Sequence, residues 1–362
     1  AVGQNVFLQN TGAATNITAA SSAGAIFNLL SNGTISSTVA GTVGATDLNL
    51  TSTTGGFALS GNVTAPNSST LSAQNNIIGT NFAATLTSTS VALTSTAGSI
   101  GDLAGNSRLN LNATNVSANA GAAGQNVFLS NGKATTINVA SGAGATFNVL
   151  STGLFNLNAV TSGTNVVLAT ATGSNAGVNI GANSNASASI AINANGSGNI
   201  ARTAVGATLT APGVSLTSGT GNIGANGTPI LTATSSLTVS TTGGSVFVDN
   251  NSANLAIAAS SGANMFDVRS NGNVSTTGVI SATDVVLRST LNNGNIDAGA
   301  TIQATASLAL QTHGSGNVSQ SAGVFQAASL DLRSTTGSFG LSKNALDTDV
   351  QNIAANTGGA GN

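Results

Sequence analysis

The stretch Gly213-Val214-Ser215-Leu216-Thr217-Ser218-Gly219-Thr220-Gly221-Asn222-Ile223-Gly224 decides the fold of this chain. Apolar and polar residues alternate through its first half, with the period of two that a half-buried β-strand shows. Two glycines and small polar residues follow, which are typical of a turn. One apolar residue, Ile223, then begins another extended segment. We interpret the unit as one strand and one corner of a β-solenoid coil.

The same unit recurs along the chain. Ser90–Ser95 leads to Gly98-Ser99-Ile100-Gly101, and Ser329–Ser334 leads to Gly337-Ser338-Phe339-Gly340. A single coil cannot bury its apolar face alone, so such units must stack on their neighbours. Stacking also gives every strand its main-chain partners.

A longer repeat contains the short one. Gly3–Leu8 returns with identical residues as Gly124–Leu129, 121 positions later, and Gly244–Val248 is a weaker third copy. Such self-similarity at a fixed period is typical of repeat architectures. Three tandem modules are therefore expected, near residues 1–121, 122–240 and 241–362.

The spacing of strand ends predicts the size of a coil. The apolar strand ends Val268, Leu287, Leu310 and Leu332 are separated by 19, 23 and 22 residues. A period near 21 residues predicts roughly 17 coils in one continuous solenoid. Parallel crossovers are overwhelmingly right-handed, so we expect an all-β, right-handed parallel β-helix.

Composition supports an all-β chain. Charged residues are only 4% of the 362 residues, whereas apolar residues are 40%. This balance differs from that of disordered chains, which combine low hydrophobicity with high net charge. Glu is absent and Lys is scarce, which removes good formers of exposed helices, while Thr, Val and Ile favour strands.

Composition also argues against several classes of function. The chain has no Cys, so it has neither a disulfide framework nor a thiolate metal site. A formal net charge of −2 gives no polybasic surface for nucleic acid or anionic lipid. No apolar run approaches the roughly 20 residues of a membrane span. The chain begins at Ala1 without a leader, and we interpret it as a processed product or a segment of a larger protein.

The one recurring charged pattern lies in the third module. Arg269, Arg288 and Arg333 each follow an apolar residue that is expected to point inward, and each precedes a Ser. Asp267 and Asp331 stand two residues before an Arg and should share its face of the strand. We expect an outer charged stripe. It is either a ladder of surface ion pairs, worth little each, or a docking stripe for a partner or a sugar acid.

Metal and cofactor sites are not expected. The only His, His313, stands in a predicted turn, and the chain has neither Cys nor Glu to complete a metal or nucleophile constellation. Asp347 and Asp349 offer too few oxygens for calcium. We therefore predict no metal ligand and no cofactor.

A catalytic site is not expected either. A carbohydrate-active β-helix needs acidic and basic residues clustered in one groove, and the candidates are Asp297, or Asp331 with Arg333. Because the first two modules carry few charges, we predict no catalytic residue and no enzyme.

The repeated pattern resembles that of a known family. An x-Leu-x-Leu-x-Ser/Thr strand, a Gly-rich turn and a Gly-x-Ile-Gly segment are carried by Leu93 and Ile100, by Leu216 and Ile223, and by Leu332 and Phe339. They resemble the repeat regions of filamentous-haemagglutinin-like exoproteins, which are bacterial surface adhesins exported by two-partner secretion. The resemblance implies a right-handed β-helix on the surface of a bacterium or secreted from it.

These observations lead to one expected function and two alternatives. We expect an extracellular structural protein that forms or extends a bacterial surface filament through stacked coils. Its partners are expected to be further copies, bound end to end or laterally, with host or neighbouring-cell glycans as a further candidate. The alternatives are the stalk of a secreted haemagglutinin-like adhesin and a carbohydrate-active β-helix enzyme.

Overall fold

The chain is an all-β parallel β-solenoid of about 16 turns, each of about 22 residues. A computed structural model describes residues 3–81, 83–101, 108–291, 293–340 and 343–358, and its regular elements over these ranges are all strands. The predicted fold class is confirmed, with slightly fewer and longer turns. One reason is an insertion: Ile100 pairs with Val127, 27 residues on, whereas Ile77 pairs with Ile100, 23 residues on.

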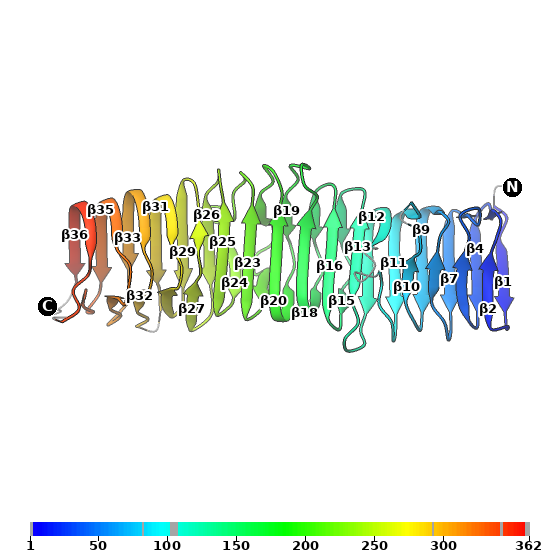
Figure 1. The fold of residues 1–362 in the computed structure, drawn as a ribbon, viewed down its shortest axis with the longest axis horizontal. Coiled ribbons are helices and arrows are strands. Elements are labelled where there is room, and N and C mark those ends of the chain that lie inside the picture. The colour runs from blue at the N-terminus through cyan, green and yellow to red at the C-terminus, as the bar shows by residue number, and fades with distance from the viewer. Residues whose placement is uncertain (1–2, 82, 102–107, 292, 341–342, 359–362) are drawn as a thin grey trace. The chain divides into compact units, whose positions relative to one another are not determined.

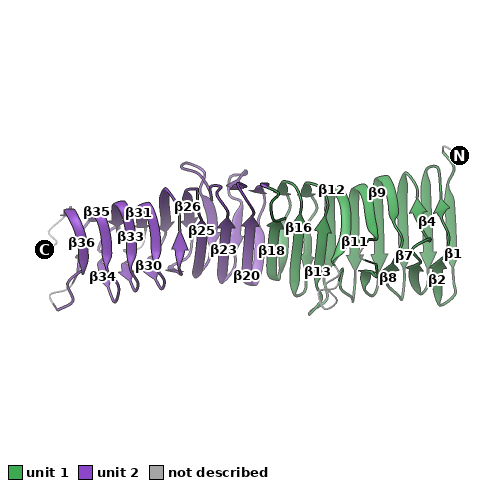
Figure 2. Ribbon diagram, turned by 45° about the horizontal axis from the view of Figure 1, so that its top comes forward, with its two compact units in different colours: residues 1–174 green, residues 175–362 purple. Residues whose placement is uncertain are grey.

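The solenoid divides into two compact units, residues 1–174 and 175–362 (Figure 2). Within each unit, strands of successive coils lie side by side (Figure 1). The strands of unit 1 are β1 (Val6–Asn10), β2 (Ala14–Ile17), β3 (Ser21–Ser22), β4 (Ile26–Ser31), β5 (Thr34–Ser37), β6 (Val43–Gly44), β7 (Asp47–Ser52), β8 (Phe57–Leu59), β9 (Val63–Ala73), β10 (Ile77–Gly79), β11 (Thr85–Ser95), β12 (Leu109–Ala120), β13 (Val127–Asn131), β14 (Thr135–Ile137), β15 (Ser141–Ala143), β16 (Thr146–Ser151), β17 (Phe155–Leu157) and β18 (Thr161–Thr170).

Unit 2 consists of the same kind of coil. Its strands are β19 (Val178–Ile180), β20 (Ser184–Ala194), β21 (Ile200–Arg202), β22 (Thr208–Thr210), β23 (Gly213–Ser218), β24 (Ile230–Ala233), β25 (Ser236–Thr241), β26 (Val246–Asn250), β27 (Asn254–Ile257), β28 (Ser260–Ser261), β29 (Met265–Ser270), β30 (Asn273–Thr276), β31 (Ile280–Ser289), β32 (Ile296–Ala298), β33 (Ile302–Gln311), β34 (Val318–Gln320), β35 (Phe325–Ser334) and β36 (Thr348–Thr357).

The core of each unit consists of apolar columns that run from coil to coil. In unit 1, Leu29, Leu50, Leu71 and Leu93 stack on one another through the parallel pairs β4–β7, β7–β9 and β9–β11, and all four are buried. Identical registers place the same side-chain type at the same inward position, so one alternating pattern serves every coil.

Unit 2 contains the column that the spacing of strand ends predicted. Val268, Leu287, Leu310 and Leu332 are direct ladder partners in β29, β31, β33 and β35, and all four are buried. A second column on another side of the coil consists of Val274, Ile296, Val318 and Phe339. The predicted inward residues of this unit are confirmed.

The recurring glycines have two different physical roles at the corner. A Cβ on Gly221 would lie 2.2 Å from the carbonyl oxygen of Gly198 in the preceding coil, so only hydrogen fits there. Gly224 has φ of +70°, in the left-handed region that glycine enters without strain. The other copies of the motif repeat the two roles, with close approach at Gly98 and Gly337 and positive φ at Gly101 and Gly340.

The Ser or Thr that ends the long strand ties one corner to the next. The Ser334 hydroxyl donates to the carbonyl oxygen of Gly316 at 3.0 Å and accepts the amide of Gly337 at 2.8 Å. Ser95 makes the same two bonds, to the Asn75 carbonyl and from the Gly98 amide. The hydroxyl thus satisfies buried backbone groups at a point where the ladder is interrupted.

The strand registers do not test two of the predictions made from the sequence. The three modules and the right-handed sense of the coil remain predictions from the repeats and from the crossover rule.

Within the described ranges, no helix has the length and hydropathy needed to cross a membrane.

Candidate functional site

Three of the charged residues predicted from the sequence, Asp267, Arg269 and Arg288, form a compact cluster on unit 2 together with Asp249, which the sequence analysis did not include in the stripe. Asp249 of β26, Arg269 of β29 and Arg288 of β31 are successive ladder partners. Arg269 reaches Asp249 at 3.8 Å and Asp267 at 3.4 Å, and Arg288 reaches Asp267 at 2.8 Å. The alternation of β29 puts Asp267 and Arg269 on the same face of the sheet, as predicted.

Asp267 is more enclosed than the sequence suggested. Its side chain is only 8% exposed, although it occupies an outward position. The two guanidinium groups lie over it, and residues 225–227 and Pro229 line a small cavity together with Asp249, Asp267 and Arg269. A carboxylate in such a place depends on its cationic partners, because an unpaired buried charge is costly.

The side chain of Asp249 is also partly buried in this cluster, which changes its pKa. Burial raises the pKa of this carboxyl above its ordinary value, because the loss of hydration outweighs the attraction of Arg269. The cluster is therefore an ion-pair network in which two arginines compensate the charge of Asp267, whereas burial destabilises the charged form of Asp249.

Asp331 and Arg333 form a separate pair. The Nε atom of Arg333 lies 2.8 Å from Oδ2 of Asp331, and the Arg333 side chain is 65% exposed. Its hydrogen bond to Asp331 raises the pKa of Arg333. Gln311 occupies the ladder position between Arg288 and Arg333 and accepts a hydrogen bond from Arg288. The predicted stripe is thus one column of side chains that holds two distinct ion-pair groups.

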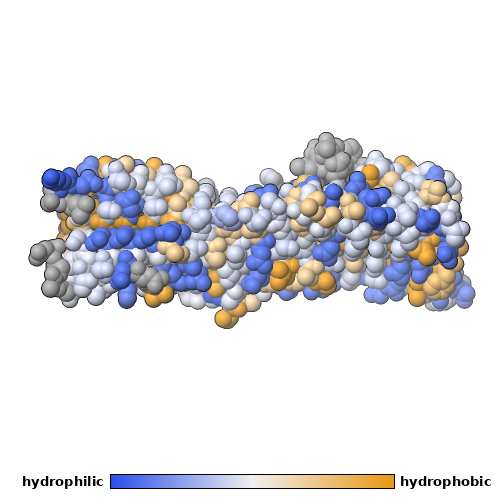
Figure 3. Space-filling view, turned by 90° about the horizontal axis from the view of Figure 1, so that it is seen from below, coloured by the Kyte–Doolittle hydropathy of each residue, from blue (hydrophilic) through white to orange (hydrophobic). Residues whose placement is uncertain are grey.

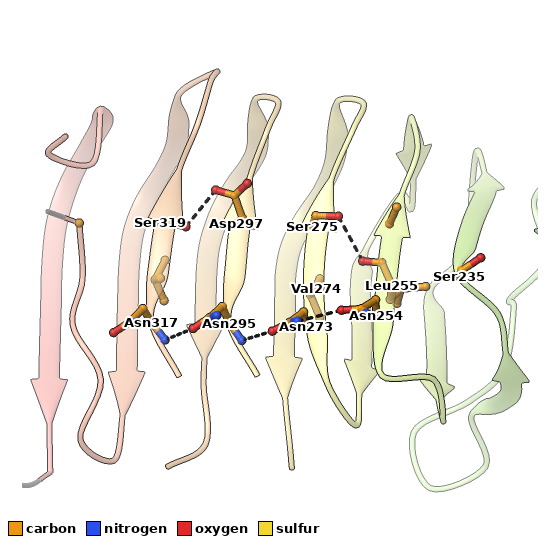
Figure 4. Close-up of a pocket in the computed structure, with 13 residues that line it drawn as sticks. Ser235, Asn254, Leu255, Asn273, Val274, Ser275, Asn295, Asp297, Asn317 and Ser319 are labelled. Atoms are coloured by element: carbon orange, nitrogen blue, oxygen red, sulfur yellow. Dashed lines mark hydrogen bonds between the residues drawn. The ribbon is translucent and has the colours of Figure 1, made fainter. Parts of the chain in front are cut away.

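A groove that the sequence analysis did not predict lies on another side of the same coils. It is formed at β27, β30, β32 and β34 and encloses about 530 Å³ (Figure 4). Its lining is neutral except for one carboxylate and consists of Ser235, Asn254, Leu255, Ala256, Asn273, Val274, Ser275, Asn295, Asp297, Asn317, Val318, Ser319 and Gly340.

An asparagine ladder forms one edge of this groove. Asn254, Asn273, Asn295 and Asn317 stand one per coil, in a row (Figure 4). The Oδ1 atom of Asn273 accepts a hydrogen bond from the backbone N–H of Asn295 at 2.9 Å, and the Oδ1 atom of Asn295 accepts one from the backbone N–H of Asn317 at 2.8 Å. Asn273 also donates through Nδ2 to Oδ1 of Asn254 at 2.8 Å. The ladder therefore fixes the orientation of each amide.

Seen from below, hydrophilic residues form a row along the coils of unit 2, beside a row of hydrophobic ones (Figure 3). One polar residue per coil at a constant position produces such a row. The sequence did contain a signal for the asparagine ladder, since each Asn directly precedes an inward apolar residue at spacings of 19, 22 and 22.

Asp297 supplies the carboxylate of the groove. Ser319 donates to its Oδ1 at 2.9 Å and Ser321 donates to its Oδ2 at 3.1 Å, both from the next coil. Asp297 belongs to β32, whereas Asp331 and Arg333 belong to β35, on the side of the coil that carries the charged column. The structure therefore does not bring the three considered catalytic residues into one groove.

His313 lies exposed at a turn, in the position predicted for it. Among the residues that the structure describes, no three His, Cys, Asp or Glu side chains gather in a way that suits a metal ion.

Comparison of the chain with protein-family models, with curated proteins and with solved structures finds no match.

Proposed function

We propose that this chain is an extracellular structural protein that forms or extends a bacterial surface filament by end-to-end stacking of its coils. The observation that carries the proposal is that β1 and β36, the first and last described strands, each have one ladder partner among the described residues. Both edges keep the inward alternation of the interior coils, so each presents a surface of the kind that coils already use to bind one another.

The β36 edge is the better defined of the two. Within the described residues β36 pairs only with β35, in a register that puts Ile353 on Leu330 and Ala355 on Leu332. These two side chains extend the apolar columns of unit 2, and Ile353 is 60% exposed in the structure of the described residues. An uncovered edge with free backbone donors and acceptors is a template for another strand.

The β1 edge offers the matching surface. Val6, Leu8 and Asn10 stack on Phe27, Leu29 and Ser31 of β4, and Leu8 is 52% exposed. When β36 of one copy adds to β1 of the next, the columns continue as Ile353 on Val6, Ala355 on Leu8 and Thr357 on Asn10. Apolar residues then meet apolar residues, and the polar pair falls at the corner.

The surface favours such an assembly. With 4% charged residues and a formal net charge of −2, copies approach one another with little electrostatic repulsion. The same property permits lateral contact between neighbouring filaments. The resemblance of the repeats to haemagglutinin-like exoproteins supports a place at the bacterial cell surface.

Two adjacent alanines provide a sharp test. Ala355 points into the column that the next copy would cover, whereas Ala354 points outward, and both are exposed in the single chain. We expect electron microscopy to show filaments of the native chain that lengthen with concentration. Ala355→Lys should abolish them, because a buried lysine without a partner is costly. Ala354→Lys should leave them intact.

Single particles of the native chain at every concentration would overturn the proposal and favour the adhesin stalk, in which further coils of one polypeptide cover both edges. Equal filament formation by the two lysine variants would also contradict it, since the inward column would then play no part. Circular dichroism on both variants checks that the strands are retained.

A further inference from the structure

We propose that the groove lined by the asparagine ladder binds a linear, neutral polysaccharide that lies along the direction in which the coils stack. This inference goes beyond the proposed filament and does not depend on it, because the groove lies on a side of the coils and not at the open edges.

The hydrogen-bond donors of the groove come from the ladder. The Oδ1 atoms of Asn254, Asn295 and Asn317 are occupied by bonds within the ladder or to the amide of Ser338. Their Nδ2 groups have no partner among the residues that the structure describes, and all three side chains are exposed. Since the oxygen of each amide is held, its two N–H donors are directed outward before any ligand arrives, which lowers the entropic cost of binding.

The acceptors lie beside these donors. Asp297 receives one hydroxyl on each carboxylate oxygen, and each oxygen has a further lone pair for a ligand. Ser319 and Ser275 add hydroxyl oxygens that can accept from a ligand, since their own hydrogens are donated to Asp297 and to the carbonyl oxygen of Leu255. A ligand that suits this surface needs many groups that both donate and accept, which is the character of sugar hydroxyls.

The spacing of the groups favours a polymer. Adjacent strands in a sheet lie about 4.8 Å apart, so the ladder presents one amide at that interval along the groove. This is close to the length of one sugar ring in an extended chain, so that each ring can lie beside one coil. A small rigid ligand would use only one or two of the repeated amides.

The shape and charge of the groove further limit the class of ligand that fits it. Its volume of about 530 Å³ lies within the range of ligand sites, and its lining includes the small residues Ala256 and Gly340. The lining contains one carboxylate and no cationic side chain. An anionic polymer would therefore be repelled by Asp297 and would find no cation to pair with.

A matched pair of serines tests the site. Ser275 lines the groove, whereas Ser281 occupies a comparable half-buried outward position in the next strand, away from it. We would titrate the purified chain with cellohexaose, chitohexaose and amylose fragments as neutral probes, with oligogalacturonate as the anionic probe, by isothermal calorimetry. We expect at least one neutral probe to bind and the anionic probe to fail.

Ser275→Trp should fill the groove and weaken binding by about tenfold or more, whereas Ser281→Trp should leave the affinity unchanged, with both variants retaining the native melting temperature. Asp297→Asn, which keeps the shape of the side chain, should weaken binding without abolishing it.

Failure of every neutral probe, or equal binding by the two tryptophan variants, would overturn the inference. Loss of lateral bundling in Ser275→Trp without any sugar binding would also overturn it, since the groove would then be an interface between copies. Filament formation is scored separately, so the two proposals fail independently.

Discussion

Arg288 holds Asp267 across two neighbouring coils, with its Nη1 atom 3.0 Å from Oδ1 and 2.8 Å from Oδ2 of the carboxylate. The Asp267 side chain is 8% exposed and that of Arg288 is 27% exposed. The contact joins β29 to β31 through side chains, in addition to the backbone ladder, and it explains how a carboxylate is kept nearly buried in a chain that has few charges.

The first prediction compares this arginine with another in the same column. Arg288→Ala should lower the free energy of unfolding by about 2 kcal/mol, less than for a fully buried pair, because Arg288 is partly exposed and Arg269 remains near Asp267. Arg333→Ala should leave the unfolding midpoint unchanged, because its pair with Asp331 lies in solvent. Urea denaturation of both variants measures the difference, and equal midpoints would contradict the assigned burial of Asp267.

The second prediction concerns pH. Burial raises the pKa of Asp249 above its unfolded value of 3.8, so the folded state disfavours the charged form. The stability linked to this group is present below pH 3.8 and is lost as the pH rises through the raised folded value. Asp249→Asn should therefore improve in stability relative to the native chain between pH 3 and pH 7, as measured by urea denaturation at both values.

Salt separates the two influences on Asp249. Salt screens the attraction between Asp249 and Arg269 but does not restore the lost hydration. The relative gain of Asp249→Asn should therefore persist in high salt. If the stability of Asp249→Asn relative to the native chain instead falls from pH 3 to pH 7, the ion pair, and not burial, dominates the pKa of Asp249.

The third prediction tests the close approach of coils at the corners. Gly221→Ala places a Cβ against the backbone carbonyl of Gly198, which cannot move without disturbing the ladder, so we expect a loss of about 3 kcal/mol. Gly121→Ala is the matched control, since a Cβ there meets nothing within 4 Å and the φ of Gly121 is not in the left-handed region. Its effect should stay within about 0.5 kcal/mol. Thermal melts of the two variants give the comparison.

Much of the fold followed from the sequence because the information is local and repeated. Alternation through Val214–Thr217 identifies the inward face of a strand, and the glycines at 221 and 224 mark the corner that follows. Repetition then multiplies the signal, so that the column of Val268, Leu287, Leu310 and Leu332 could be predicted from spacing alone.

The candidate sites were harder to predict from the sequence than the fold, because they depend on the register between coils. Spacing placed Arg288 and Arg333 at equivalent positions, but the intervening coil puts Gln311 between them. Likewise, each Asn of the ladder is an ordinary polar residue in a chain rich in Asn, and only its place before an inward apolar residue, one coil apart, relates Asn295 to Asn317.

By itself, then, the sequence determined that the chain is a stack of parallel strands, which residues point inward and where the corners lie, because a period of two and the steric freedom of glycine act within a few residues. Only the tertiary structure decided that Asp267 is enclosed by two arginines and that four asparagines line one groove. Those contacts join residues about one turn apart, and the length of each turn varies by several residues. A change of one residue in a turn moves a side chain to the other face of the sheet, so the groups that meet are known only once the coils are in register.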